Sequence, residues 1–297
     1  MYATRRTVLL GLTATLAGCQ AVPRTTGFTP PEDPPMRAVP NPDFDAWVAA
    51  FRDRAAREGI AQGTIDAAFR DVGFLPGVIE KDRNQVEFDR TLEDYLAIAA
   101  SDERIETGRR MLGRHARTLE AVEARFGVER EVVTAVWGLE SKYGARKGDI
   151  PVISALATLA YDGRRGAFFG RQLIDALRIL ENGDTRPASM TGSWAGAMGH
   201  TQFMPSSYLA YAVDFTGDGR RDIWGEDPAD ALASTAAYLS RFGWRTGQPW
   251  GMEVRVPDGF DSGLAGRGTR RSVGDWAALG VRDAAGGRVP DHGPSSV

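Results

Sequence analysis

A single carboxylate interrupts an otherwise apolar helical stripe near the middle of the chain. Val133, Val136, Trp137, Glu140 and Tyr143 recur at helical spacing and fall on one face. A carboxyl group among such side chains loses hydration, so its ionised form is disfavoured and its pKa should rise. An acid that stays protonated near neutral pH can donate a proton to a leaving group. Glu140 is therefore a candidate catalytic acid, and the alternative is a buried glutamate paired with an arginine.

A loop at residues 193–208 combines small residues with polar side chains. Its glycines would let a ligand approach the backbone closely. Ser193, Gln202 and Tyr208 offer hydrogen-bond donors and acceptors, and Trp194 offers an apolar plate. Sugars are bound by this mixture of flat apolar faces and fixed polar partners. The loop is therefore a candidate saccharide site, and the alternative is a packed loop that only supports neighbouring helices.

An acidic, glycine-containing segment follows, and it resembles the start of a calcium loop of the EF-hand type. Asp214, Thr216 and Asp218 place oxygen atoms at alternate positions, and Arg220 could add its backbone carbonyl. The chain departs from the pattern at Gly225, where the loop needs a bidentate glutamate. Because every ligand would be oxygen, calcium is preferred over a transition metal. The expected role is structural, and the alternative is a solvated acidic turn.

The elements that position these residues are predicted to be helices, so the fold class is mainly α. The expected helices cover residues 44–51, 64–69, 88–100, 109–126, 129–143, 152–159, 168–180 and 229–242. Gly63 or Thr64 should cap the second helix, and Pro151 suits the first turn of the sixth. Residues 252–256 alternate as a strand does, and a short helix could start at Ser272.

The N-terminal segment has the composition of an export signal. Arg5 and Arg6 precede an apolar run at residues 7–17, which is too short to cross a bilayer. The run ends in Leu-Ala-Gly-Cys, which resembles a bacterial lipoprotein box with Cys19 as the lipidated residue. The alternative is a plain secretory signal, and the paired arginines also resemble a twin-arginine signal. Residues 20–43 are proline-rich and are predicted to be an extended tether.

Composition narrows the classes of partner. The 297 residues are 42% hydrophobic, which is enough for a sizeable core, and the net charge of −3 gives no basic field for nucleic acid. Cys19 is the single cysteine, so the mature chain can form no disulfide or cysteine zinc site. We expect a monomer.

Two motifs together resemble the lytic murein transglycosylase B family of lysozyme-like enzymes. They are Trp-Gly-Leu-Glu-Ser-Lys-Tyr-Gly at residues 137–144 and Ser-Trp-Ala-Gly-Ala-Met-Gly-x-x-Gln-Phe-Met-Pro-Ser-Ser-Tyr at 193–208. The resemblance covers roughly residues 44–250. It implies a helical subdomain at 44–126, a lysozyme-like core at 127–250, and a C-terminal segment at 251–297 that is short for the family.

The resemblance also implies roles for single residues. Glu140 matches the catalytic glutamate, and Ser193 and Gln202 match loop residues that bind the saccharide. Tyr238 matches an aromatic residue of the same groove, although without the family a helical tyrosine would be assigned to the core. A lengthened calcium loop would close on Asp230.

The family's chemistry needs one acid, whereas a glycosidase ordinarily uses two carboxylates. In the family, the glutamate protonates the oxygen between N-acetylmuramic acid and N-acetylglucosamine, and then acts as base on the muramoyl 6-hydroxyl, which attacks C1. The product carries a 1,6-anhydromuramoyl end, and no cofactor is required. Asp149 or Asp162 could otherwise supply a second acid. The alternative functions are a hydrolytic muramidase and a non-catalytic peptidoglycan-binding lipoprotein. The protein is expected in the periplasm, with a lipid anchor in the outer membrane.

Overall fold

The computed structural model describes residues 36–84, 91–249 and 251–297. The export signal, the lipidation residue and most of the tether lie outside the described residues, as does the predicted start of a helix at 88. The described elements, in chain order, are α1 (Pro42–Arg57), α2 (Gln62–Phe69), α3 (Pro76–Arg83), α4 (Leu92–Ala99), α5 (Asp102–Arg114), α6 (Ala116–Phe126), α7 (Arg130–Ser141), β1 (Ile150–Pro151), α8 (Val152–Asp162), α9 (Gly166–Glu181), η2 (Pro187–Ser189), β2 (Thr191–Gly192), α10 (Pro205–Tyr211), α11 (Ala229–Arg241), β3 (Val254–Arg255), η3 (Ser262–Leu264), α12 (Val273–Ala278) and β4 (Arg282–Asp283).

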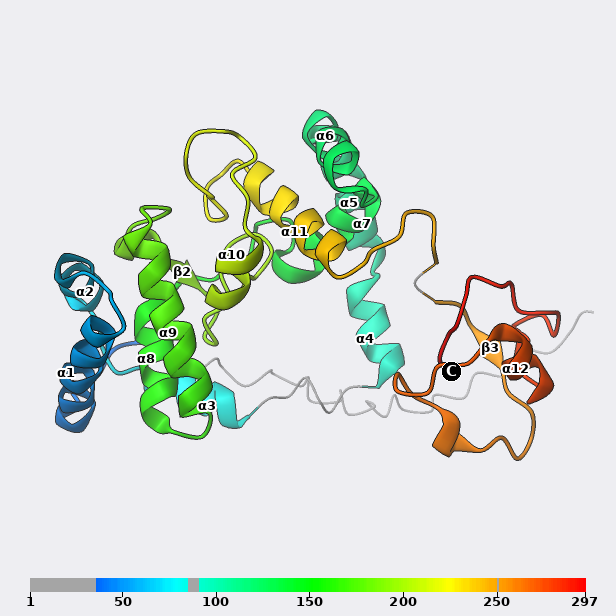
Figure 1. The fold of residues 1–297 in the computed structure, drawn as a ribbon, viewed down its shortest axis with the longest axis horizontal. Coiled ribbons are helices and arrows are strands. Elements are labelled where there is room, and N and C mark those ends of the chain that lie inside the picture. Colours follow the sequence, from blue (N-terminus) through cyan, green and yellow to red (C-terminus); the bar gives the residue numbers. More distant parts are fainter. Residues whose placement is uncertain (1–35, 85–90, 250) are drawn as a thin grey trace, which may run out of the picture. The chain divides into compact units, whose positions relative to one another are not determined.

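Helices dominate the described chain (Figure 1), which confirms the mainly α prediction. Its strands form two antiparallel pairs of two residues each, β1 with β2 and β3 with β4. Neither pair is long enough to form a layer of its own. The strands therefore serve to fix loops, and the core is built by helix packing.

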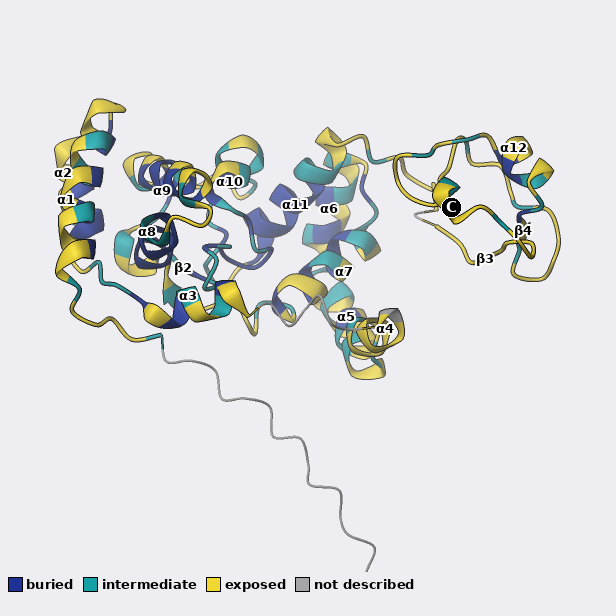
Figure 2. Cartoon of the chain, turned by 90° about the horizontal axis from the view of Figure 1, so that it is seen from below, coloured by how far each residue is buried: buried dark blue, intermediate teal, exposed yellow. Residues whose placement is uncertain are grey.

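The larger hydrophobic core surrounds α8 and α9. Nine consecutive residues of α8 are buried, which is why Figure 2 draws this helix almost wholly in dark blue. Helix α8 packs against α9, α1 and α3, and α9 also packs against α2 and α10. Leu156, Leu173 and Ile174 are among its fully buried side chains. A helix buried on every side is expected to be mainly apolar, and the two buried hydroxyls of α8, on Ser154 and Thr158, accept the backbone amides of Gly73 and Leu75.

A second core joins α6, α7 and α11. Leu119 and Val122 of α6, Val133 and Trp137 of α7, and Ala236 of α11 belong to it. Helix α11 packs against both α6 and α7, and α5 packs against α7. Elements from either side of residue 126 therefore share one core. This packing fixes α7, the helix that carries Glu140.

The β1–β2 pair connects the chain after α7 to the glycine-rich loop. Ile150 pairs with Gly192, and Pro151 pairs with Thr191. The loop then turns back on itself through backbone bridges from Met198 to Gly192 and to Phe203. The short sheet thus holds the segment after α7 beside the segment that carries Ser193 and Gln202.

Three helix predictions need correction, one in its middle and two at the first turn. The predicted helix 109–126 is broken at His115 into α5 and α6, because both pieces pack against α7. Helix α2 begins at Gln62 without a cap from Gly63 or Thr64, since the Glu181 carboxylate accepts from the Ala61 amide at 2.7 Å instead. Pro151 precedes α8 rather than opening it, because it belongs to β1.

Other differences arise where sequence periodicity was weak. The ordered body starts before residue 44, since Met36 packs on the core, the Val39 amide donates to the Phe74 carbonyl at 3.0 Å, and Pro42 opens α1. The tether prediction therefore ran too far. The strand expected at 252–256 shortens to β3. Helices α3 and α10 were not predicted, and each begins at a proline in a segment with too few residues for a periodic pattern.

Candidate active site

Glu140 lies in the last turn of α7, one residue before the helix ends. Val133 and Trp137 are buried as predicted, but Glu140 itself is exposed at the end of the stripe. The protein around the carboxyl group still removes enough water to raise its pKa. Within the part of the chain that the structure describes, no hydrogen bond or ion pair engages this carboxylate. A carboxyl group with a raised pKa and no protein partner is available to exchange a proton with a ligand.

The end of α7 has a strained and well-anchored backbone. Lys142 and Tyr143 follow the helix with φ values of 49° and 58°, in the left-handed region that side chains rarely adopt. The Tyr143 ring lies against Gly138, where any added Cβ would meet it. Its hydroxyl donates to the Arg104 carbonyl of α5 at 2.8 Å. Such strain persists where surrounding contacts hold it, and it is common at functional sites.

Ser193 and Gln202 lie at the two ends of the loop turn and are half-buried. The Ser193 hydroxyl accepts from the Ala197 amide at 3.1 Å. The Gln202 side chain donates through Nε2 to the carbonyls of Lys147, at 3.0 Å, and Gly199, at 2.8 Å. Gln202 adopts a φ of 52°. The amide group is thus fixed by two donated bonds, and its Oε1 has no partner among the described residues.

The two tyrosines assigned to saccharide binding differ in accessibility. Tyr238 of α11 is half-buried in an aromatic cluster with Phe203, Tyr211 and Phe242, at ring separations of 5.9, 5.0 and 4.6 Å. Tyr208 is fully buried, and its hydroxyl donates to the Arg221 carbonyl at 2.5 Å. Burial raises the pKa of Tyr208 far above the ordinary value. Tyr208 has no surface to offer a ligand, so its assignment to the binding site was wrong.

The two aspartates considered as a second acid differ in their surroundings. Asp162 pairs with Arg83 of α3 at 2.7 Å, and its side chain is only 10% exposed. Asp149 is exposed between α7 and β1 and has no bond that engages its side chain in the described chain. The ion pair with Arg83 and the low exposure of its side chain disfavour Asp162 as a second acid.

The acidic loop is ordered by its own backbone. Both oxygens of the Asp214 carboxylate accept loop amides, those of Gly217 at 2.6 Å and Gly219 at 2.9 Å. Asp230 is buried, and its carboxylate accepts the amides of Phe215, at 2.9 Å, Thr216 and Asp222. Asp218 is turned outward to Arg220. Among residues 36–84, 91–249 and 251–297, no three His, Cys, Asp or Glu side chains are grouped so that they could hold a metal ion.

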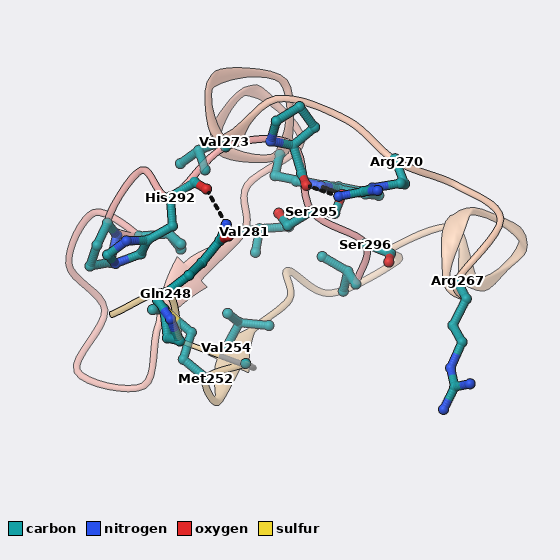
Figure 3. A pocket seen from close by; sticks show the side chains of 18 residues that line it. Gln248, Met252, Val254, Arg267, Arg270, Val273, Val281, His292, Ser295 and Ser296 are labelled. Carbon is teal, nitrogen blue, oxygen red and sulfur yellow. Dashed lines mark hydrogen bonds between the residues drawn. The ribbon is translucent and has the colours of Figure 1, made fainter. Parts of the chain in front are cut away.

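A cavity of about 570 Å³ is lined by residues between Gln248 and Val297 (Figure 3). Val254, Val273, Trp276 and Val281 form part of its apolar lining. Arg270 points to the Pro294 carbonyl, and Gln248 to the His292 carbonyl, at 2.9 and 2.7 Å. None of the predicted site residues lines this cavity.

A model of the Transglycosylase SLT domain matches residues 43–296, which is most of the chain. The chain belongs to the transglycosylase SLT domain family. The match includes the C-terminal segment that the motifs did not reach.

Individual relatives of this SLT domain are lytic transglycosylases. The membrane-bound lytic murein transglycosylase B of Escherichia coli (strain K12) is 37% identical over 162 residues, which cover 52% of this chain and 42% of the relative. The crystal structure of SltB3 from Pseudomonas aeruginosa in complex with NAG-NAM-pentapeptide is 50% identical, with a TM-score of 0.80, over 85% of this chain and 67% of that one. The Escherichia coli transglycosylase Slt35 in complex with calcium is 27% identical, with a TM-score of 0.69, over 80% and 75%.

These matches confirm the lysozyme-like transglycosylase fold. The chain spans less than half the length of the curated relative that it matches. No helix in the described ranges is both long and apolar enough to cross a membrane.

Sequence reasoning missed two polar residues that organise the site of this SLT domain. His200 is 4% exposed and bonds to Trp137 and Gly225. Lys147 donates through Nζ to the carbonyls of Trp224, at 2.5 Å, and Gly225, at 3.0 Å. His200 stood inside the quoted loop motif, so a histidine within a run of small residues was an available signal. Nothing in the sequence around Lys147 indicated that its ammonium group binds carbonyls some 77 residues away.

Proposed function

We propose that the protein is a lytic transglycosylase, which cleaves the β-1,4 bond between N-acetylmuramic acid and N-acetylglucosamine in peptidoglycan and leaves 1,6-anhydromuramoyl ends. The observation that carries the proposal is the Glu140 carboxyl group, which has a raised pKa and no hydrogen-bond or ion-pair partner among residues 36–84, 91–249 and 251–297. It lies at the end of a helix that is bonded to the Ser193–Gln202 loop. The relatives named above, one of them in complex with NAG-NAM-pentapeptide, support this substrate class.

Glu140 would act twice. The protonated carboxyl group first gives its proton to the glycosidic oxygen as the bond from that oxygen to C1 breaks. The resulting carboxylate then takes the proton of the muramoyl 6-hydroxyl, whose oxygen forms the new bond to C1. The proton count of Glu140 is restored, and no water enters the product. A raised pKa suits this double role, because it keeps the acid protonated before the first step and makes its carboxylate a better base in the second.

Ser193 and Gln202 would hold the saccharide beside Glu140, with Tyr238 against an apolar sugar face. Gln202 supports this role because two donated bonds fix its amide group and leave Oε1 for a ligand hydroxyl. A group held in place before binding loses little entropy when the ligand arrives. We expect the chemistry to need no cofactor and the protein to act as a monomer.

The proposal is tested by release of soluble muropeptides from purified sacculi. Glu140→Gln keeps the shape of the side chain but can neither donate nor retrieve the proton, so release should fall to background. Glu131→Gln is the matched control, because Glu131 is an exposed glutamate in the first turn of the same helix. The control should digest sacculi at the parent rate. Release by Glu140→Gln at a rate near that of the parent would contradict the assignment.

A second proposal concerns the acidic loop, which we propose binds calcium with a structural role. Its sequence and the calcium complex of Slt35 support this proposal. The described conformation does not by itself fit the ion, because the carboxylates of Asp214 and Asp230 accept backbone amides and Asp218 faces outward. Binding would therefore require Asp214, Asp218 and Asp230 to converge, with oxygen from Thr216 and the Arg220 carbonyl. No catalytic step depends on the ion.

The third proposal is that Cys19 is lipidated and anchors the enzyme in the periplasm, on the outer membrane. The Leu-Ala-Gly-Cys ending of a short apolar run supports it, as does the membrane-bound relative from Escherichia coli. Gln20 follows the cysteine and is not an acid. A proline-rich stretch extends about 3 Å per residue, so it would let the anchored body reach a polymer at a distance from the bilayer.

A further inference from the structure

His200 connects the helix of Glu140 to two loops, although no step proposed above uses its imidazole. The ring is buried and accepts a hydrogen bond at Nδ1 from the Trp137 indole, at 3.1 Å. Its Nε2 lies 2.7 Å from the Gly225 carbonyl. Because Nδ1 accepts and a carbonyl can only accept, the proton of the neutral ring must lie on Nε2.

The backbone of the same residue is also engaged. The Ser141 hydroxyl donates to the His200 carbonyl at 2.6 Å and accepts from the Gly144 amide at 2.9 Å. Trp137 lies nearly one helical turn before Glu140, and Ser141 follows it directly. Two bonds from this single loop residue therefore fix the helical turn on which Glu140 stands.

Further hydrogen bonds connect His200 to Gln202. The Gly225 carbonyl that accepts from His200 also accepts from the Lys147 ammonium at 3.0 Å. The Lys147 carbonyl in turn accepts from the Gln202 side chain at 3.0 Å. A chain of direct bonds thus runs from α7 through His200, Gly225 and Lys147 to Gln202.

We propose that His200 is a positioning residue, which in its neutral form holds Glu140 in register with the saccharide-binding side chain of Gln202. The inference rests on the proposed function of Glu140. It assigns no contact between the imidazole and the substrate, because the ring is buried. A displacement of about 1 Å at a catalytic group can lower a rate on the order of 100-fold, so such a tie has a measurable consequence.

The surroundings of the ring favour the neutral form. Burial is the main cause that lowers the pKa of His200, and the positive charge of Lys147 acts in the same direction. The Gly225 carbonyl and Asp222 act in the opposite direction. His115, whose ring stands edge-on to Trp137 at a centroid distance of 5.4 Å, also lowers the pKa of His200. A protonated ring has no lone pair at Nδ1, so it cannot accept from Trp137. Acid should therefore break the bond between the Trp137 indole and the ring, while the bond from Ser141 to the His200 backbone carbonyl remains.

Two substitutions separate the hydrogen bonds from the titration. In His200→Gln, the amide oxygen can accept from Trp137 and the amide nitrogen can donate to Gly225, and no group titrates. We expect this variant to retain at least about a third of kcat. The fall of kcat at acid pH, which we assign to protonation of His200 in the parent, should move to lower pH in this variant. In His200→Leu both bonds of the ring are lost and the backbone bond from Ser141 remains, so kcat should fall at least on the order of tenfold at pH values where the parent ring is neutral.

Loss of stability alone is controlled by Thr158→Val. The Thr158 hydroxyl is buried in α8 and accepts from the Leu75 amide at 3.1 Å, so this variant also breaks one buried bond but leaves α7 untouched. Its kcat should stay at the parent value well below its melting temperature. If His200→Leu lost no more activity than Thr158→Val, or if His200→Gln were as poor as His200→Leu, the positioning role would be overturned.

A double-mutant cycle with Trp137→Phe tests the shared bond directly, because phenylalanine keeps a ring but has no indole proton. The losses of kcat in Trp137→Phe and His200→Leu should be far from additive in the double variant. Additive losses would contradict the coupling.

One readout is independent of catalysis. The Trp137 indole proton, identified by its absence from the ¹⁵N NMR spectrum of Trp137→Phe, should be protected from solvent exchange in the parent and in His200→Gln. It should lose protection in His200→Leu and in the parent at acid pH. Equal protection in His200→Leu would overturn the role of His200. A parent that releases no muropeptides while the indole proton behaves as expected would instead contradict the proposed function.

Discussion

The hydroxyl of Ser141 donates to the carbonyl of His200 at 2.6 Å, so the residue after Glu140 is bonded to the loop that carries Gln202. Helix α7 and the loop at residues 193–208 are far apart in sequence, and in the described chain no strand longer than two residues positions either of them. Side-chain bonds such as this one therefore set the geometry of the site. The consequence is that some residues which never touch the substrate should affect the rate.

Ser141→Ala should lower both stability and kcat. The hydroxyl is buried, and its removal leaves the His200 carbonyl and the Gly144 amide without their partner, at a cost of about 1–3 kcal/mol. We expect a lower melting temperature together with a kcat loss larger than the change in KM. Ser240→Ala is the control, since Ser240 is exposed on α11 and should change neither quantity. A Ser141→Ala enzyme with the parent kcat would show that this bond does not set the position of Glu140.

The pH profile of kcat should fall on its alkaline side with the ionisation of Glu140. Partial desolvation by the surrounding protein raises the pKa of Glu140 above the ordinary value of 4.5, and only the protonated form can start the reaction. Activity should therefore be highest below this raised pKa and decline as pH rises through it. Rates measured on sacculi across a pH series would check the sign. An activity that grows steadily with pH up to the alkaline range would be incompatible with Glu140 acting first as an acid.

Thr201→Val should stabilise the protein. The Thr201 hydroxyl is buried beside His200 and has no hydrogen-bond partner among the described residues. Valine has nearly the same shape and removes a polar group that loses water without gaining a bond, so we expect a gain of about 1 kcal/mol. Thr158→Val provides the contrast, because its hydroxyl accepts the Leu75 amide and its loss should destabilise. Thermal unfolding of both variants would decide, and a lower melting temperature for Thr201→Val would contradict the account of this loop.

Calcium should raise the melting temperature of the soluble body by an amount set by its concentration over its dissociation constant. Asp218→Asn should weaken this effect, since Asp218 is exposed and its loss should leave the metal-free fold intact. Melting curves in excess calcium and in excess chelator give the comparison. Identical curves would remove calcium from the account and leave Asp230 as a residue that caps loop amides.

Cys19→Ser should release the protein from membranes into the soluble periplasm with its activity preserved. Several acyl chains on one cysteine make membrane attachment effectively permanent, and serine cannot carry them. Cell fractionation and the mass of the mature N-terminus provide the test. A serine variant that still sediments with membranes would mean that the segment is an ordinary signal peptide.

Much of the fold followed from the sequence because long amphipathic segments such as α9 and α11 have strong helical periodicity. Short helices such as α10 and the break at His115 did not, because long-range packing decides them. Glu140 stood out by its chemistry, and the match to the SLT domain family agrees with the resemblance indicated by the motifs at residues 137–144 and 193–208. The exposure of Glu140 at the end of α7 was not predictable. Periodicity indicates which side of a helix faces the core, but not how deeply its last turn is buried.

The polar network was the least accessible part of the site. The bonds of His200 and Lys147 join segments separated by 25 to 78 residues. Local patterns carry no information on such pairs. Tyr208 shows the converse error, since a tyrosine in a polar loop appeared suited to a sugar although it is buried in the core.

The central claim is that the substrate's own 6-hydroxyl oxygen forms the new bond to C1 after the glycosidic bond breaks. Glu140 acts first as the acid and then as the base. Mass spectrometry of muropeptides released from sacculi in ¹⁸O-labelled water tests this claim most directly. The parent enzyme should give anhydromuramoyl ends without ¹⁸O, and Glu140→Gln should give no products. Reducing muramoyl ends that carry ¹⁸O would identify a hydrolytic muramidase, and binding without any product from the parent would identify a non-catalytic peptidoglycan-binding protein. Either result would contradict the proposed reaction.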